Sequence, residues 1–183
     1  IVSWASLKRR FRQARMAPAG DTAVGTQAAA FLIRDNIRHR NDILHAYVHA
    51  IDAAREEILI ATAYFLPGFR FAHALYSAAR RGVKISVLLQ GKTDHPLLRY
   101  ATQALYTNAL GAGIRVFEYE KSFMHPKVAV IDRYWATVGS SNIDPFSLLI
   151  AKEANLVVRD AGFADELGRS INDAIANGGR EML

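Results

Sequence analysis

The residues of this sequence best suited to chemistry are His125 and Lys127, which stand two apart, and Ser140 and Asn142, which follow a reversal of the chain. Apolar and β-branched residues around that reversal predict a strand, a tight turn and a returning strand. Because side chains alternate along a strand, His125 and Lys127 share one face, and Ser140 and Asn142 share a face by the same rule. An imidazole and an ammonium group, with a hydroxyl and an amide able to lie across from them, form a site suited to a phosphate group.

The elements that must position these residues alternate between strand and helix. The expected strands are 27–34, 57–63, 83–90, 114–119, 127–132, 136–140 and 155–159. The expected helices are 42–55, 71–81, 97–110 and 163–176. This alternation predicts an α/β domain in which a mixed β-sheet is flanked by helices. Ligands of such sheets bind where strands end, so the loops 64–70, 91–96 and 141–151 are expected to surround the site.

The composition indicates one globular domain with a basic surface. The chain has 183 residues, of which 51% are hydrophobic, and this suffices for a substantial core. A net charge of +6 favours an anionic partner, either nucleic acid or acidic lipid, although a solvated basic surface explains it equally well. The sequence has no cysteine, which excludes disulfides and thiolate metal sites. Its longest apolar run, 58–68, is too short to span a bilayer.

Residues 1–25 are expected to form a basic amphipathic linker or interfacial helix that precedes the domain at 26–183. Trp4, Leu7 and Phe11 recur at helical spacing, and lysines and arginines fill most of the remainder. Such a segment suits the surface of an anionic membrane, while its narrow apolar face also suits a solvated linker helix. The chain does not begin with methionine, so we expect it to be a piece of a longer protein.

His45 and His49 stand one helical turn apart, which is the spacing of a two-histidine metal site. No glutamate occupies the place that a metalloprotease helix needs, and no third ligand suggests itself nearby. We therefore expect these histidines to be solvated or capping groups and expect no metal at this helix.

The candidate residues follow a longer pattern. The sequence reads His125-x-Lys127-x4-Asp132-x6-Gly139-Ser140-x-Asn142. This pattern resembles the HKD signature of the phospholipase D superfamily, which also places a serine and a glutamate where Ser147 and Glu153 stand. The stretches 63–68, 90–96, 116–119 and 139–147 are similar to the second half of bacterial cardiolipin synthases, and the similarity runs from about 31 to 176. One departure is Ala151, where that family commonly has asparagine.

The resemblance implies a covalent phosphohistidine mechanism that uses no metal and no cofactor. One imidazole attacks phosphorus and a second protonates the leaving oxygen, so His125 would need a partner histidine from a second motif. Lys127, Ser140 and Asn142 would neutralise the charge on the phosphate oxygens. Glu153 would bind the other ring nitrogen of His125 and fix its tautomer.

The resemblance gives four catalytic positions: His125, Lys127, Asp132 and Glu153. Asp132 faces away from His125 by strand alternation, so we expect it to support the hairpin rather than act as the acid. Lys92 and His95 lie in the loop after the 83–90 strand and are expected to contact the substrate head group, although a local structural use of His95 stays open.

The resemblance predicts a phosphatidyltransferase half that makes cardiolipin-type phospholipids. Its expected partners are anionic phospholipids, a peripheral membrane surface, and a second HKD half in the same full-length chain or in a homodimer. Its expected location is the cytoplasmic face of the bacterial inner membrane. One alternative is a homodimeric single-motif phosphodiesterase or nuclease that acts on nucleic acid. Another is a non-catalytic half that supports a catalytic partner.

Overall fold

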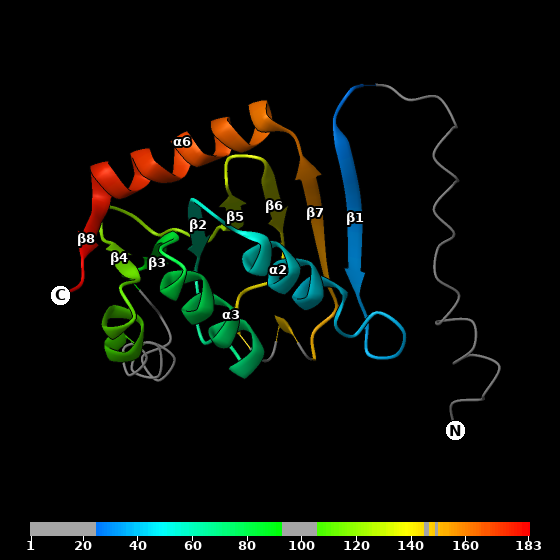
Figure 1. Cartoon of the computed structure of the whole chain (residues 1–183), viewed down its shortest axis with the longest axis horizontal. Coiled ribbons are helices and arrows are strands. Elements are labelled where there is room, and N and C mark those ends of the chain that lie inside the picture. Colours follow the sequence, from blue (N-terminus) through cyan, green and yellow to red (C-terminus); the bar gives the residue numbers. More distant parts are fainter. Residues whose placement is uncertain (1–24, 93–105, 145–146, 149) are drawn as a thin grey trace.

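The structure of the chain is a computed structural model, and it describes residues 25–92, 106–144, 147–148 and 150–183. Within these residues, eight strands form one mixed sheet in the order β1-β7-β6-β5-β2-β3-β4-β8 (Figure 1). The strands are β1 Ala28–Arg34, β2 Glu57–Thr62, β3 Lys84–Gln90, β4 Arg115–Tyr119, β5 Lys127–Ile131, β6 Trp135–Gly139, β7 Glu153–Arg159 and β8 Gly179–Glu181. The helices are α2 Asp42–Ala53, α3 Phe69–Arg80 and α6 Ala161–Gly178. The predicted α/β class with a mixed sheet is confirmed.

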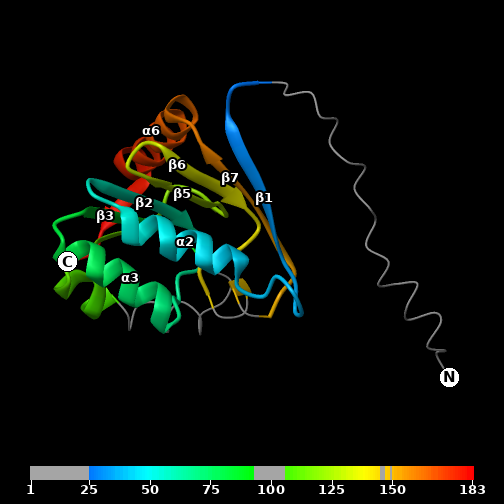
Figure 2. The same ribbon diagram turned by 45° about the vertical axis from the view of Figure 1, so that its right-hand side comes forward.

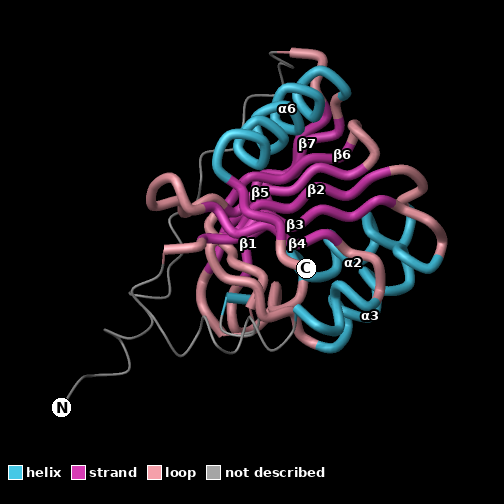
Figure 3. The backbone as a smooth tube through the Cα atoms, turned by 90° about the vertical axis from the view of Figure 1, so that its left-hand side faces the viewer, coloured by secondary structure: helices cyan, strands magenta, loops and turns pink. Residues whose placement is uncertain are grey.

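The helices lie in two layers, one on each face of the sheet. α2 and α3 pack side by side on one face, and α6 crosses the other (Figures 2 and 3). Tyr47 and Phe71, from α2 and α3, are buried in the same cluster as Ile60 of β2. Ile171 of α6 is buried in a second cluster with Leu59. Because consecutive residues of β2 face opposite layers, the strand reads as a continuous apolar run.

The strand directions gather many connecting loops at one edge of the sheet. β2, β3 and β4 run parallel, and β5 runs antiparallel to β2. β6, β7 and β1 then alternate in direction. One edge of the sheet, the lower one in Figure 1, therefore holds the ends of β1, β2, β3, β4 and β6. The same edge holds the beginnings of β5 and β7. We call it the motif edge because the residues before β5 and after β6 carry the motif.

The strands and helices predicted from the sequence closely match those of the structure. The helix expected at 97–110 lies partly outside the described residues, and its described end at 106–111 is helical. β8 was not predicted, because a three-residue strand shows no alternation of apolar and polar side chains. Its place depends on pairing with β4, where Arg180 binds the buried Glu118 carboxylate at 2.8 Å.

Asp132 ties the turn of the β5–β6 hairpin to the chain that leads into β2. Its carboxylate accepts hydrogen bonds from the backbone N–H groups of Arg55, Glu56 and Glu57 at 2.9, 2.9 and 3.0 Å. Asp132 and Arg133 have φ angles of 49° and 51°, a left-handed conformation that aspartate tolerates better than most residues. Asp132 therefore stabilises the fold at the edge opposite the motif edge.

Replacing Asp132 with alanine is expected to lower the free energy of unfolding by about 3 kcal/mol, because three backbone N–H groups lose a charged acceptor. Urea unfolding followed by circular dichroism measures the loss. Asp132→Asn is the matched control and should lose less, since it keeps an acceptor oxygen and tolerates a positive φ. An unfolding midpoint that Asp132→Ala leaves unchanged would contradict this role.

Candidate active site

The β5–β6 hairpin carries the candidate residues to the motif edge. Lys127 is the first residue of β5 and lies opposite Thr62 of β2. Ala129, Val130 and Ile131 are buried, on both faces of the sheet, which fixes the register of the strand. Gln90, at the end of β3, accepts a hydrogen bond from the backbone N–H of Met124 at 2.9 Å. This bond holds the chain immediately before His125.

His125 and Lys127 are in direct contact. Lys127 Nζ lies 2.9 Å from His125 Nδ1 and 3.2 Å from Nε2, and it donates to the His125 carbonyl at 3.2 Å. The imidazole is exposed and contacts two aromatic rings, a nearly parallel Phe123 at 6.0 Å and an edge-on Tyr64 at 6.1 Å. An accessible imidazole beside an ammonium group can bind and attack an anionic phosphorus centre.

The surroundings of Lys127 shift its pKa in opposite directions. Burial lowers the pKa of Lys127 from its ordinary value, whereas the carboxylates of Glu153 and Asp144 raise it. The net effect is a lowered pKa. Partial removal of water also strengthens the attraction between this ammonium group and an anion bound beside it.

Ser140 and Glu153 meet where β6 and β7 approach the motif edge. Ser140 Oγ donates to the Glu153 carboxylate and accepts a hydrogen bond from the Ala154 backbone N–H at 3.0 Å. The predicted contact between Glu153 and His125 stays a prediction. The contact that the structure shows for Glu153 is with the hydroxyl of Ser140, which is itself a candidate phosphate ligand.

The glycine of the motif has a steric cause. A Cβ atom at Gly139 would lie 2.2 Å from Asn155 Oδ1, closer than atoms can approach. Asn155 is buried and donates to Thr137 Oγ1 at 3.1 Å, so it cannot move aside without losing that bond. Gly139 therefore allows β6 and β7 to pair closely just before Ser140.

The structure brings some of the other predicted residues to this region and not others. Asn142 follows Ser140 and is half-buried, and its Oδ1 atom has no hydrogen-bond partner in the described part of the chain. Lys92 is exposed at the motif edge, with Nζ 3.5 Å from the carbonyl of Lys121. Asp132 lies at the far end of β5 from His125. His95 lies outside the described residues.

Arg34, which lies outside the HKD pattern, supports the loop between β6 and β7. It is fully buried, and it donates to the carbonyls of Leu148, at 3.2 Å, and Ala151. It pairs in register with Glu153 across β1 and β7, and burial lowers its pKa. A buried guanidinium that binds two loop carbonyls fixes the path of the chain into Glu153. The signal in the sequence is a lone arginine at the end of an apolar strand.

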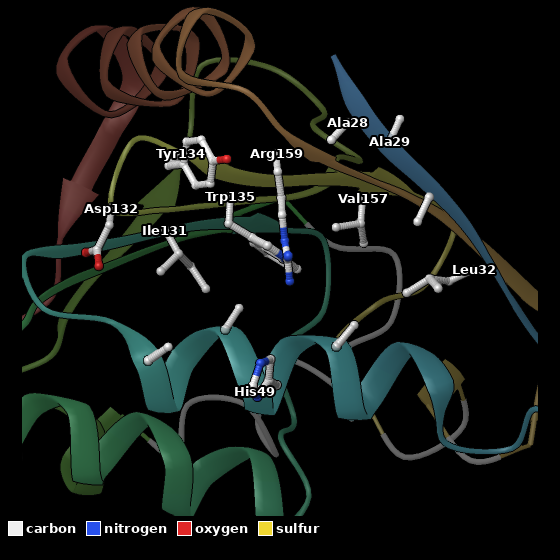
Figure 4. Close-up of a pocket in the computed structure, with 14 residues that line it drawn as sticks. Ala28, Ala29, Leu32, His49, Ile131, Asp132, Tyr134, Trp135, Val157 and Arg159 are labelled. Atoms are coloured by element: carbon white, nitrogen blue, oxygen red, sulfur yellow. The ribbon is translucent and has the colours of Figure 1, made fainter. Parts of the chain in front are cut away.

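A cavity of about 610 Å³ lies between β1 and α2, away from the motif edge (Figure 4). Its lining includes Leu32, His49, Trp135 and Arg159, together with Asp132. His125, Lys127, Ser140 and Glu153 are not among its lining residues. This cavity is therefore separate from the candidate active site.

The fold has clear relatives among solved structures. Nuc from Salmonella typhimurium, a phospholipase D family member, is similar with a TM-score of 0.70 and 20% identity, over 86% of this chain and 99% of that chain. Phosphatidylserine synthase from Haemophilus influenzae Rd KW20 is similar with a TM-score of 0.69 and 12% identity, over 85% of this chain and 40% of that chain. These similarities define the class of the fold, which is that of phospholipase D.

The sequence defines the family within that class. Residues 47–175 match the family described as cardiolipin synthase, PLD-like domain, and the chain belongs to this family. Cardiolipin synthase B from Escherichia coli (strain K12) is 48% identical over 143 residues, which are 78% of this chain and 35% of that protein. Cardiolipin synthase A from Yersinia pestis bv. Antiqua is 35% identical over 136 residues, 74% of this chain and 28% of that protein. The chain thus spans about a third of the length of these relatives.

Proposed function

We propose that this chain supplies one catalytic half of a phosphatidyltransferase that makes cardiolipin-type phospholipids through a phosphohistidine intermediate. The observation that carries the proposal is the exposed His125 imidazole in contact with the Lys127 ammonium group. Membership of the cardiolipin synthase family supports a phospholipid as the substrate. We place the protein peripherally at the cytoplasmic face of the bacterial inner membrane. Across the described residues, none of the helices is long and apolar enough to cross a membrane.

The proposed reaction has two steps. First, a lone pair on a His125 nitrogen attacks the phosphorus of the donor lipid, the N–P bond forms, and the P–O bond to the leaving alcohol breaks. A second imidazole donates the proton that the leaving oxygen takes up. Next, the hydroxyl of the acceptor lipid loses its proton to that second imidazole and attacks phosphorus, and the N–P bond breaks. With phosphatidylglycerol as donor and acceptor, glycerol leaves and cardiolipin is the product.

The reaction needs a partner half, because the HKD pattern occurs once in this sequence. The partner is a second motif in the full-length protein or a second copy related by a two-fold axis.

An apolar row on the face of the sheet that carries α6 supports such a contact. Phe31, Leu156 and Val138 pair in register across β1, β7 and β6, and each is at least partly exposed. Burying this row against a second half would remove apolar surface from water.

A second candidate function is a phosphodiesterase or nuclease that works as a homodimer. The observation that favours it is the match to Nuc, which covers 99% of that chain, so one copy of this fold makes up nearly all of the Nuc chain. The net charge of +6 suits nucleic acid as well as anionic lipid.

Exchange of glycerol separates the two candidate functions. Liposomes of phosphatidylglycerol are incubated with radiolabelled glycerol and with the chain, both alone and within the full-length protein. We expect label in the lipid, because reversal of the first step joins glycerol to the phosphatidyl group held on histidine. Plasmid and single-stranded DNA are offered to the same preparations. DNA cleavage without glycerol exchange would reject the phosphatidyltransferase in favour of the nuclease.

A further inference from the structure

Four large apolar side chains are exposed at the motif edge. They are Ile37 after β1, Phe69 at the start of α3, Phe123 before β5 and Ile150 before β7, and 78%, 85%, 62% and 59% of their surfaces are exposed. At the opposite edge, Tyr134 is the one exposed large apolar side chain in the described loops between helices and strands. Apolar side chains gathered at one end of a molecule mark an interaction surface.

Basic residues accompany each of these apolar side chains. Arg38 adjoins Ile37, Arg70 adjoins Phe69, Lys121 lies two residues before Phe123, and Lys152 lies two residues after Ile150. All four are exposed. We call these four apolar and four basic residues the docking face.

Acidic groups at the motif edge do little to offset this charge. Glu120 is the exposed acid among the described residues of these loops, and its carboxylate binds Arg180 at 2.5 Å. The carboxylate of Asp35 accepts hydrogen bonds from three backbone N–H groups of its own loop. The docking face therefore presents a positive charge around its apolar side chains.

Among anionic partners, this combination best fits a lipid bilayer. Apolar side chains enter the boundary between head groups and acyl chains, while lysine and arginine beside them bind the phosphates. Protein interfaces are depleted in lysine, which supplies two of the four basic residues of the docking face, Lys121 and Lys152. Single-stranded nucleic acid is bound by aromatic stacking, which Ile37 and Ile150 cannot provide.

We propose that the docking face inserts into the surface of an anionic bilayer and so presents the exposed His125 to lipid head groups. The proposal rests on the proposed function in one respect, namely that the substrate is a lipid of that bilayer. It adds the orientation of the protein, with the motif edge towards the membrane and the turn at Tyr134 away from it. Phe123, which stacks on His125, would connect the docking face to the candidate active site.

Labels at single positions test this orientation. Because the sequence has no cysteine, single cysteines placed by Ile37→Cys, Phe69→Cys and Ile150→Cys can each carry an environment-sensitive fluorophore. With vesicles of phosphatidylglycerol and phosphatidylcholine, the emission at all three positions should shift to the blue. Tyr134→Cys, also exposed but at the opposite edge, is the matched control and should not shift. Equal shifts at all four positions, or none at 69 and 150, would overturn the proposal.

Charge variants test the basic part of the docking face. Arg70→Gln with Lys152→Gln is expected to weaken vesicle binding about 20-fold at physiological ionic strength, because each cation near an anionic surface adds to affinity. Arg80→Gln with Lys84→Gln removes two exposed cations at the opposite edge and should change binding less than about twofold, since charges beyond a Debye length are screened. Equal losses in the two double variants would show general charge attraction and reject the docking face.

The fluorescence shift does not depend on turnover, so it tests the docking face separately from the glycerol exchange that tests the proposed function. If the labels insert in the full-length protein and that protein shows no glycerol exchange, the docking face stands and the phosphatidyltransferase is rejected. Glycerol exchange without insertion of the labels would reject the docking face and leave the phosphatidyltransferase standing. Labels that respond to a single-stranded oligonucleotide and not to vesicles would assign the docking face to nucleic acid and overturn the proposal.

Discussion

Replacing His125 with asparagine is expected to reduce phosphatidyl transfer by about 10,000-fold or more, because the nitrogen that forms the covalent bond to phosphorus is lost. Asparagine keeps a polar side chain of similar size at an exposed position, so the fold should be unaffected. Glycerol exchange on phosphatidylglycerol liposomes measures the loss. Trapping of ³²P-labelled lipid phosphate on the protein after acid-free denaturation measures the intermediate itself, and the variant should retain no label.

His49→Asn is the matched control for His125→Asn. His49 is an exposed histidine on α2, beside the cavity rather than at the motif edge, and its replacement should leave exchange unchanged. If His125→Asn in the full-length protein retains normal turnover, this half is not catalytic. The third interpretation of the sequence, a non-catalytic half that supports its partner, would then hold.

Replacing Lys127 with methionine is expected to reduce the rate by about 100- to 1,000-fold, because the ammonium group that neutralises the phosphate oxygens in the transition state is lost. Methionine preserves the apolar stem, so the packing of the strand should persist. Because the charge on the oxygens concentrates in the transition state, most of the effect should fall on kcat rather than on KM. Lys84→Met, at the start of β3 and the opposite edge, is the control and should keep its activity.

The lowered pKa of Lys127 gives this prediction a pH dependence. The protonated form is the active one, so activity should fall as the pH rises through the pKa of Lys127. Burial lowers that pKa below the ordinary value of 10.5, so the fall begins at a lower pH than for a lysine in water. Lys127→Arg, whose guanidinium stays charged, should lose this alkaline fall even if its overall rate is reduced. If the activity of Lys127→Arg falls at the same alkaline pH as that of the unsubstituted protein, the titrating group is not Lys127.

The sequence alone determined the fold class and the hairpin. Strand alternation and turn formation depend on neighbouring residues, so the apolar run from Lys127 and the return to Ser140 could be recognised without any long-range contact. The separation of Asp132 from His125 has a different cause from strand alternation, because β5 is Lys127–Ile131 and the two residues lie beyond its opposite ends. Local periodicity could not show β8, whose three residues depend on pairing with β4.

Only the tertiary structure decided which distant residues meet. The bonds from Asp132 to Glu57 and from Arg34 to Leu148 join positions 75 and 114 residues apart. Asn155 leaves no room for a side chain at Gly139, and this clash likewise arises only because β6 and β7 lie side by side. Strand order sets these contacts, and strand order follows from the packing of the whole sheet rather than from any local pattern. For the same reason, four separate loops became one docking face only when their strands were aligned to end or begin at the motif edge.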